Sequence, residues 1–484
     1  MSDWIEEEFG AVNLGDKRCN DRLRLVLKRR ADQPQASISA SCHGRNEVIA
    51  ASRFFNNELV TSEKILTPHR DCILERIHEA AYPEVLLIQD TTECDFSTHK
   101  ALTGMGPLGA KEHRGFFAHN QLAVTTEHLP LGLWKTQLYA RQDEDHGKAA
   151  KRKAKSIQDK ESMRWLEGYR DACALAKEVP GCQIISISDR EGDIYEVFAE
   201  YTQRKAQGQS AAEFLIRSNQ DRCLKRFEKS AKKPGKIRDQ LAQAPALGEI
   251  KFHVPKAEQL KKVKGSRQLV TRSARDVVQE VRAIPIRLKP PSRQVGETLP
   301  VVELTVVEAR EINPPAGEKP LVWILLTSLP VETLAQAEAV LKRYLCRWEI
   351  ELFHKVLKSG CKLEALQQRY DFSLKPAIII CMIIAWRILY ATQLGRTCPE
   401  LPCEVMFDRN EWEPVVVVLN KGRATLKSPP TLGEMIILIA KLGGYLGRKN
   451  DPPPGSKCLW VGMARMADIA LGWEASHRPP ADTG

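Results

Sequence analysis

The order of apolar and polar residues predicts a helical start, a strand-rich middle and a helical end. Residues 1 to about 70 follow a helical period and carry few strand signals. Within them, Asp16–Arg30 interleaves leucines with basic side chains, so a helix there would bury one face and present arginines on another. The candidates for phosphate contacts are Arg22, Arg24, Arg29 and Arg30. A solvated basic helix explains the same pattern equally well.

Short apolar runs in the middle of the chain predict buried strands that end on carboxylates. Val85–Ile88 leads to Asp90 at the strand's C-terminal end, and a second run leads to Asp189. Residues 116–140 predict two strands around a turn at 128–130, and residues 211–218 predict a strand that ends near Arg217. Residues from about 220 to 310 are basic with alternating patches, which indicates an antiparallel strand-rich insertion.

One long helix is predicted from Thr333 to Lys358. At about 100° per residue it would gather four polar side chains in a stripe about 60° wide. Those side chains are Tyr344, Arg347, Glu351 and Lys358. A carboxylate beside cations suits a phosphodiester site with bound metal, but a surface helix with ion pairs at helical spacing has the same pattern.

The C-terminal part reads as apolar helices separated by irregular chain. Residues 374–396 and 432–446 predict helices, and residues 397–431 are irregular and contain proline. The most apolar run, Ala377–Trp386, has ten residues and suits a buried helix rather than a membrane span. We therefore expect no membrane association.

Composition narrows the class of protein only slightly. The chain has 484 residues, enough for two or three domains, and 43% hydrophobic and 27% charged residues, as in an ordinary soluble protein. A net charge of +11 favours polyanions, nucleic acid first. The 13 cysteines show no metal-binding spacing, and no signal peptide opens the chain. Reduced thiols in a cytoplasmic protein are expected.

Three acidic residues from distant points form the candidate chemistry. Asp90 and Asp189 at matching strand ends, with Glu351 on a later helix, would provide the oxygen ligands that Mg²⁺ or Mn²⁺ prefers. Two such ions can activate water or a 3′-hydroxyl for displacement at a phosphodiester. Each aspartate alone is equally explained as a helix cap. The pattern also leaves a ribonuclease H-type hydrolase open.

Longer stretches resemble a known family. LLIQDTT and ISDREGDIY are similar to the two aspartate motifs of the bacterial cut-and-paste DDE transposases of the insertion-sequence-four family, Tn-five type. YLCRWEIELFHKVLK matches the family's YREK signature in identity and spacing, and DWIEEEFGAVNLGDKRCNDRL resembles its end-binding domain. INPPAGEKPLVWILLTSLPVETLAQA is also similar, so the resemblance covers nearly the whole chain.

The resemblance implies a fold and roles for individual residues. It implies an α/β protein with a ribonuclease H-like core and β-strand insertion (71–373, insertion at about 220–310), a helical end-binding domain (1–70) and a helical dimerisation domain (374–484). Asp90, Asp189 and Glu351 would be catalytic and hold two Mg²⁺ ions, with Mn²⁺ as a substitute. Contacts to DNA would come from Tyr344, Arg347, Lys358, Arg217, Trp323, Arg22, Arg24, Arg29 and Arg30. Trp323 would stack on a flipped base.

The implied reaction is hydrolysis at transposon ends, through a hairpin, and joining of the 3′-hydroxyl to target DNA. Double-stranded DNA, a homodimer in the synaptic complex and a bacterial, nucleoid-associated location in the cytoplasm belong to the same expectation. Two alternatives stay open: a metal nuclease that only hydrolyses, and a relative that binds ends and inhibits transposition. The end sequence, the target preference, the activity of this copy, its oligomeric state without DNA and the existence of a shortened inhibitor form do not follow from the sequence.

Overall fold

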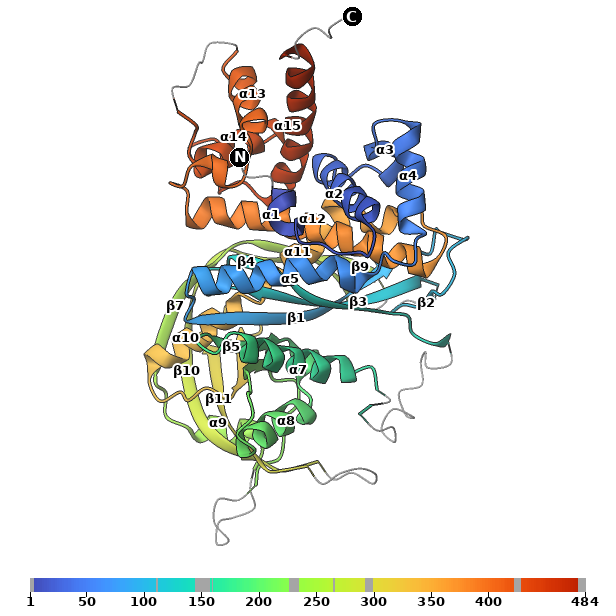
Figure 1. The fold of residues 1–484 in the computed structure, drawn as a ribbon. Coiled ribbons are helices and arrows are strands. Elements are labelled where there is room, and N and C mark those ends of the chain that lie inside the picture. The colour runs from blue at the N-terminus through green and yellow to red at the C-terminus, as the bar shows by residue number, and fades with distance from the viewer. Residues whose placement is uncertain are drawn as a thin grey trace, which may run out of the picture. The chain divides into compact units, whose positions relative to one another are not determined.

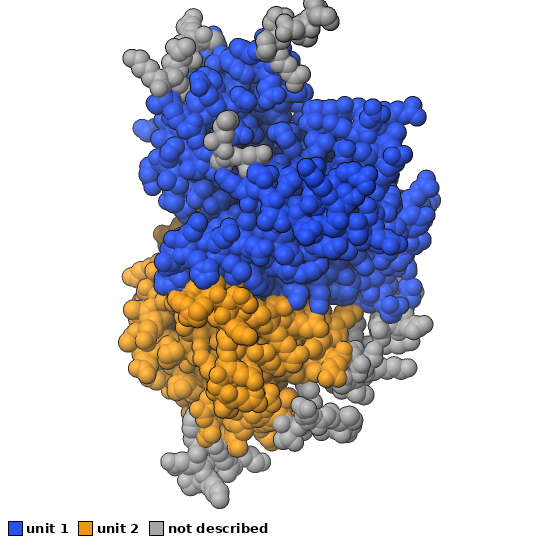
Figure 2. All heavy atoms as spheres, in the orientation of Figure 1, with its two compact units in different colours: residues 1–150, 348–484 blue, residues 151–347 orange. Residues whose placement is uncertain are grey.

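The computed structural model describes residues 4–109, 112–143, 157–158, 160–225, 235–263, 266–291, 299–421 and 428–477. The chain divides into two compact units (Figure 2). Unit 1 contains Met1–Ala150 and Trp348–Gly484, and unit 2 contains Lys151–Arg347. A basic cluster at residues 148–155, a candidate for phosphate contacts in the sequence, lies outside the described residues. The division into three domains made from the sequence stays a prediction.

The protein is mixed α/β with helical N- and C-terminal regions, as predicted, and it is consistent with a ribonuclease H-like core (Figure 1). In unit 1, β1 and β4 both pair antiparallel with β3, and β2 pairs with the start of β3. The strands of unit 1 are β1 (Glu84–Asp95), β2 (Gly106–Pro107), β3 (Arg114–Val124) and β4 (Pro130–Tyr139).

Helices cover these strands and build both ends of the chain. The helices of unit 1 are α1 (Trp4–Phe9), α2 (Lys17–Asp32), α3 (Ile38–Ser41), α4 (Arg45–Phe55), α5 (Ser62–Glu79), α11 (Trp348–Lys355), α12 (Asp371–Thr397), α13 (Arg409–Leu419), α14 (Leu432–Leu442) and α15 (Ser456–His477). Short turns are η3 (Val356–Gly360), η4 (Leu363–Ala365) and η5 (Cys403–Val405). Both α5 and α12 pack against β4. The approach of α5 requires Gly132, because a Cβ atom there would lie 2.4 Å from the Ile73 side chain.

Unit 2 carries a second set of paired strands in the order β5-β6-β12-β11-β10-β7. The β5–β6 pair is parallel, and the other pairs are antiparallel. Its strands are β5 (Gln183–Ser188), β6 (Glu213–Arg217), β7 (Gly248–Val254), β8 (Ala257–Val263), β9 (Ser266–Arg272), β10 (Arg275–Leu288), β11 (Val302–Glu311) and β12 (Val322–Thr327). Its helices are α7 (Met163–Glu178), η2 (Arg190–Gly192), α8 (Tyr195–Ala206), α9 (Ile237–Gln243) and α10 (Leu334–Leu345). The insertion strands β7, β10 and β11 thus extend the sheet that contains β12 and β6.

Three predictions about elements are wrong. The strand of Asp90 does not end there: β1 continues to Asp95, because residues 91–95 pair with 115–119 of β3. The long helix from 333 to 358 is broken after Leu345, where the backbone N–H groups of Cys346 and Arg347 bond three residues back. The segment 397–431, expected to be irregular, contains α13.

The apolar run at 377–386 belongs to a longer helix than its ten residues suggested. Within the described part of the chain, α12 is long and apolar enough to cross a membrane by length and composition alone. Its most apolar window is 89% buried inside the protein, as in the core helix of a globular domain. The burial of α12, rather than its length, therefore indicates that it is a core helix.

Candidate active site and DNA-binding surfaces

Asp90 lies in the middle of β1, directly opposite Asn120 of β3. It is half-buried, and its Oδ1 atom accepts a hydrogen bond from the backbone N–H of Thr91 at 2.7 Å. The residues before it on β1 are buried and apolar from Val85 to Ile88, which fixes the strand in the core. The helix α11, which carries Glu351, packs against this strand. Unit 1 therefore places Asp90 and Glu351 on neighbouring elements.

The helix of Glu351 is short and held from several sides. Its first turn contains Glu349, which is 4% exposed and accepts hydrogen bonds from the Gln393 amide at 2.8 Å and bonds His128 Nδ1 at 3.0 Å. Glu351 itself is half-buried. After Lys355 the chain continues as the π-helical turn η3, an irregularity that is frequent at functional sites. The predicted single stripe of polar side chains is thus divided among α10, the turn that contains Arg347, α11 and η3.

Lys358 lies in this π-helical turn and pairs with an acid. Its Nζ is 3.4 Å from Oε1 of Glu364, and the same oxygen accepts a hydrogen bond from the backbone N–H of Asp95 at 3.0 Å. One third of the lysine side chain is exposed. The pair is therefore weak, on the order of 1 kcal/mol or less, and a phosphate can compete with Glu364 for the lysine.

In unit 2, Asp189 follows β5 directly, as the sequence predicted. Its Oδ1 atom accepts a hydrogen bond from the backbone N–H of Glu191 at 2.8 Å and so caps the turn η2. The turn is fixed by Asp193, a carboxylate to which the sequence assigned no role. Asp193 is 2% exposed and binds the guanidinium of Arg222 and the backbone N–H of Asn219. These hydrogen bonds hold Asn219 and Arg222, which follow β6, against the turn η2.

Four of the predicted DNA-binding residues lie near one another in unit 2, namely Trp323, Tyr344, Arg347 and Arg217. The rings of Trp323 and Tyr344 meet edge to face, with centroids 5.6 Å apart, and the guanidinium of Arg347 lies 5.9 Å from the Tyr344 ring centroid. Burial raises the pKa of Tyr344, the charges of Arg347 and Arg217 lower it, and Asp189 raises it. Burial also lowers the pKa of the Arg217 guanidinium. Two arginines and the Trp323 ring therefore gather around Tyr344, and the charge of Asp189 acts on the same phenol.

The N-terminal arginines of α2 have protein partners. Arg29 makes a two-pronged ion pair with Glu47 at 3.0 and 3.1 Å, which holds the pKa of that carboxyl at about 2. Arg24 donates to the carbonyl of Gly10 at 2.7 Å. Arg30 is 2% exposed and donates to backbone carbonyls, among them that of Cys361 at 3.3 Å. The structure gives these three arginines roles in joining helices; Arg22 is half-buried, and DNA contact stays a prediction for all four.

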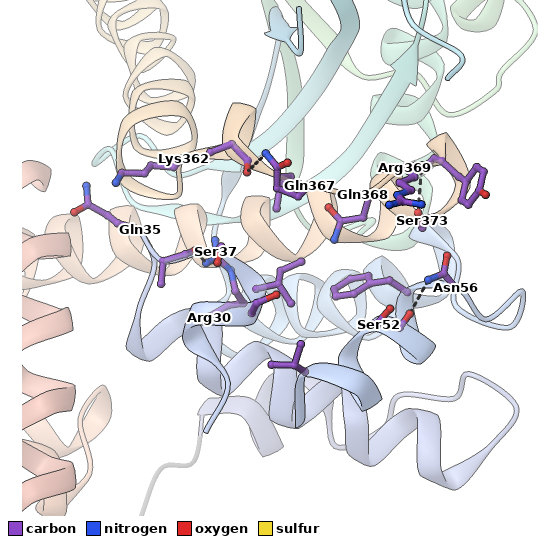
Figure 3. A pocket seen from close by; sticks show the side chains of 18 residues that line it. Arg30, Gln35, Ser37, Ser52, Asn56, Lys362, Gln367, Gln368, Arg369 and Ser373 are labelled. Atoms are coloured by element: carbon purple, nitrogen blue, oxygen red, sulfur yellow. Dashed lines mark hydrogen bonds between the residues drawn. The ribbon is translucent and has the colours of Figure 1, made fainter. Parts of the chain in front are cut away.

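A cavity of about 530 Å³ lies beside these helices (Figure 3). Residues of α2–α4 and their connections form one wall and the segment 362–373 forms the other. The described lining residues include the cations Lys362 and Arg369, carboxamides and serine hydroxyls, but no carboxylate. Gln35, Gln367 and Gln368 contribute carboxamides. A wall with this chemistry suits an anionic partner that also accepts hydrogen bonds.

The oxygen ligands suit a hard divalent cation. Asp90, Asp189 and Glu351 are all half-buried, so their carboxylates keep access to solvent. Among the residues that the structure describes, no group of three or more histidine, cysteine, aspartate or glutamate side chains is arranged to hold a metal ion. The assignment of the three acids as metal ligands therefore stays a prediction.

Comparison with protein families identifies both ends of the chain. Residues 1–60 match the family model of the transposase DNA-binding domain, and residues 383–480 match that of the transposase Tn5 dimerisation domain. The two matches support a DNA transposase of the Tn5 type. They also support DNA binding and dimer formation, the two kinds of partner that the sequence predicted.

Several residues around the candidate site were not predicted from the sequence. Asn120 of β3 bonds His354 of α11, and Glu349 of α11 bonds His128. Asp193 fixes the turn after Asp189 through Arg222. A signal exists for Asn120, because in a strand FFAHNQLAV it shares a face with Ala118 and Leu122, and a carboxamide buried there needs a partner. His354 follows Glu351 by three residues, which places both on one side of a helix.

Proposed function

We propose that the chain is a DDE transposase of the insertion-sequence-four family that performs cut-and-paste transposition. It would bind the terminal inverted repeats, cleave them by metal-dependent hydrolysis through a hairpin, and join the 3′-hydroxyl ends to target DNA. The observation that carries the proposal is the cluster in unit 2, where Trp323, Arg347 and Arg217 gather around Tyr344 and the charge of Asp189 acts on the same phenol. Such a site combines a metal ligand with phosphate-binding groups. It would work in the cytoplasm of a bacterium, at the nucleoid.

In this proposal Asp90, Asp189 and Glu351 hold two Mg²⁺ ions, for which Mn²⁺ substitutes. Ions held there would activate water or a 3′-hydroxyl and stabilise the leaving oxygen. Arg347 and Arg217 bind phosphates of the transposon end, as guanidinium groups do with two parallel hydrogen bonds. No nucleophilic side chain takes part.

The two aromatic residues of this cluster, Trp323 and Tyr344, would have a different role from the arginines. Trp323 is half-buried at the edge of the cluster and keeps part of its ring exposed. An aromatic ring in this position would stack on a base extruded from the end. Tyr344 supports the tryptophan through their edge-to-face contact.

End recognition would use the N-terminal helices together with the cavity beside them. The cations at the cavity wall, Lys362 and Arg369, and the surrounding carboxamides would bind phosphates and bases of the duplex. Lys358 would exchange Glu364 for a phosphate oxygen. The C-terminal helices would join two copies in the synaptic complex.

Purified protein should be incubated with duplexes that carry the inverted repeats flanking the coding region, with Mg²⁺ and without it. The proposal expects cleavage at the repeat ends, a hairpin and strand-transfer products, all abolished by Glu351→Ala. Hydrolysis without strand transfer would identify a nuclease instead. Binding without cleavage, with Glu351→Ala behaving like wild type, would identify an inhibitor.

A further inference from the structure

A row of polar side chains crosses three adjacent strands of unit 1. Asp90 of β1 is paired with Asn120 of β3, and Asn120 is paired with Thr136 of β4. Directly opposite residues of antiparallel strands place their side chains on the same face of the sheet. Asn120 is completely buried, and the residues on its side of β3, Ala118 and Leu122, are buried and apolar. A buried carboxamide is costly unless both of its ends are hydrogen bonded.

Both ends of the Asn120 side chain have partners. The hydroxyl of Thr136 donates to Oδ1 of Asn120 at 2.6 Å. Nδ2 of Asn120 contacts Nε2 of His354 at 2.9 Å. An amide nitrogen can only donate, so Nε2 of His354 accepts this bond. The row across the strands thus continues onto α11.

His354 connects this row to the predicted metal ligands. It follows Glu351 by three residues on α11, a spacing that puts both side chains on one side of the helix. The helix packs against β1, the strand of Asp90. The helix α11 has only eight residues, with a break before it and a π-helical turn after it. The neighbouring backbone therefore does not fix its position. Side-chain contacts must therefore set its position.

We propose that Asn120 and His354 are positioning residues that fix the separation of Glu351 from Asp90 for a shared divalent cation. The inference rests on the proposed function of both acids. Glu349 anchors one end of α11 through Gln393 and His128, and the Asn120–His354 bond anchors the side that follows Glu351. Residues that orient metal ligands in this way typically change metal affinity about 10–100-fold when replaced.

The test compares two replacements of similar size. His354→Leu removes the acceptor, whereas His354→Gln keeps an oxygen that can accept from Asn120, and both leucine and glutamine favour helices. With full-length protein and repeat-end duplex, His354→Leu should raise the Mn²⁺ concentration for half-maximal cleavage about tenfold or more. His354→Gln should stay within about threefold. Binding of free Mn²⁺ to the protein–DNA complex, followed by electron paramagnetic resonance, should change in parallel.

The partner residue gives an independent comparison. Asn120→Leu should match His354→Leu, and the double variant should add little to either, because the two side chains act through one bond. DNA binding without metal should be unchanged. Lys355→Ala, on the exposed side of the same helix, is the matched control and should leave metal dependence unchanged.

Equal metal dependence in His354→Leu, His354→Gln and wild type would overturn the proposal, as would fully additive effects of the two leucine variants. Equal metal affinities with a lowered melting temperature would show that the bond only stabilises the fold. Failure of the proposed function looks different, because wild type itself would then not cleave, or Glu351→Ala would cleave as wild type does.

Discussion

The role of Arg30 is the sharpest prediction, because the sequence and the structure assign it differently. The sequence places it among DNA-binding arginines, but its guanidinium is buried. It donates to the carbonyls of Pro34 at 3.0 Å and Cys361 at 3.3 Å, and to that of Ala36. The first and last of these lie just after α2, and Cys361 follows the turn of Lys358. Arg30 therefore joins the N-terminal helices to the region around η3.

Replacement by methionine, which has a similar length, leaves these carbonyls without their donor. Each buried acceptor without a partner costs about 1–3 kcal/mol, and part of the loss is offset because a desolvated charge disappears. A net loss of roughly 2–4 kcal/mol is expected. For a unit as large as unit 1, to which Arg30 belongs, this loss should lower the melting temperature by roughly 5–10 °C.

Two measurements on Arg30→Met separate a structural role from DNA contact. Circular dichroism gives the melting temperature, and binding to repeat-end duplex at several salt concentrations gives the slope of log K against log salt. A lost phosphate contact lowers that slope by about one. We expect a large fall in melting temperature and an unchanged slope. Arg22→Met, half-buried on the same helix, is the control and should change the melting temperature little. An unchanged melting temperature with a smaller slope for Arg30→Met would refute the reasoning.

The remaining predictions concern charge and stacking. The pKa of Glu47 is lowered to about 2 mainly by its hydrogen bonds with Arg29, so its stabilising effect is complete above pH 4.5 and is lost as the pH falls towards 2. Glu47→Gln should therefore lower the melting temperature much more at pH 7 than at pH 2.5; equal losses at both pH values would contradict this. Trp323→Ala should lower end cleavage about 10–100-fold and abolish the fluorescence rise of 2-aminopurine at the extruded base, whereas a normal signal would assign the ring to the core. Arg347→Ala should lower the salt slope of end binding by about one, and an unchanged slope would exclude its phosphate contact.

Local patterns predicted most elements correctly. The period of residues 1–70 gives the helices α1–α5, and the apolar run before Asp189 gives β5. The sequence did not predict that β1 extends beyond Asp90, because residues 91–95 are polar and become a strand only through pairing with β3. It also missed the break after Leu345, where apolar residues continue at helical spacing.

The candidate site was predictable as a set of residue types but not as an arrangement. The spacing of Tyr344, Arg347, Glu351 and Lys358 needs no structure to be recognised. Their division among α10, the turn before α11, α11 itself and η3 does need one, because helix breaks depend on what each turn packs against. The same holds for Lys358, whose nearest acid, Glu364, lies on a separate turn.

The sequence by itself determined which chemical groups the protein has and which elements carry them, because these depend on residue identity and on local periodicity. Only the tertiary structure decided what those groups contact. The basic pattern of residues 16–30 groups Arg30 with arginines for DNA contact, but in the folded chain Arg30 is a buried donor to backbone carbonyls. Asn120 is an unexplained buried carboxamide until His354, 234 positions away, is placed against it. Contacts at such sequence separations arise from packing, which local patterns do not encode.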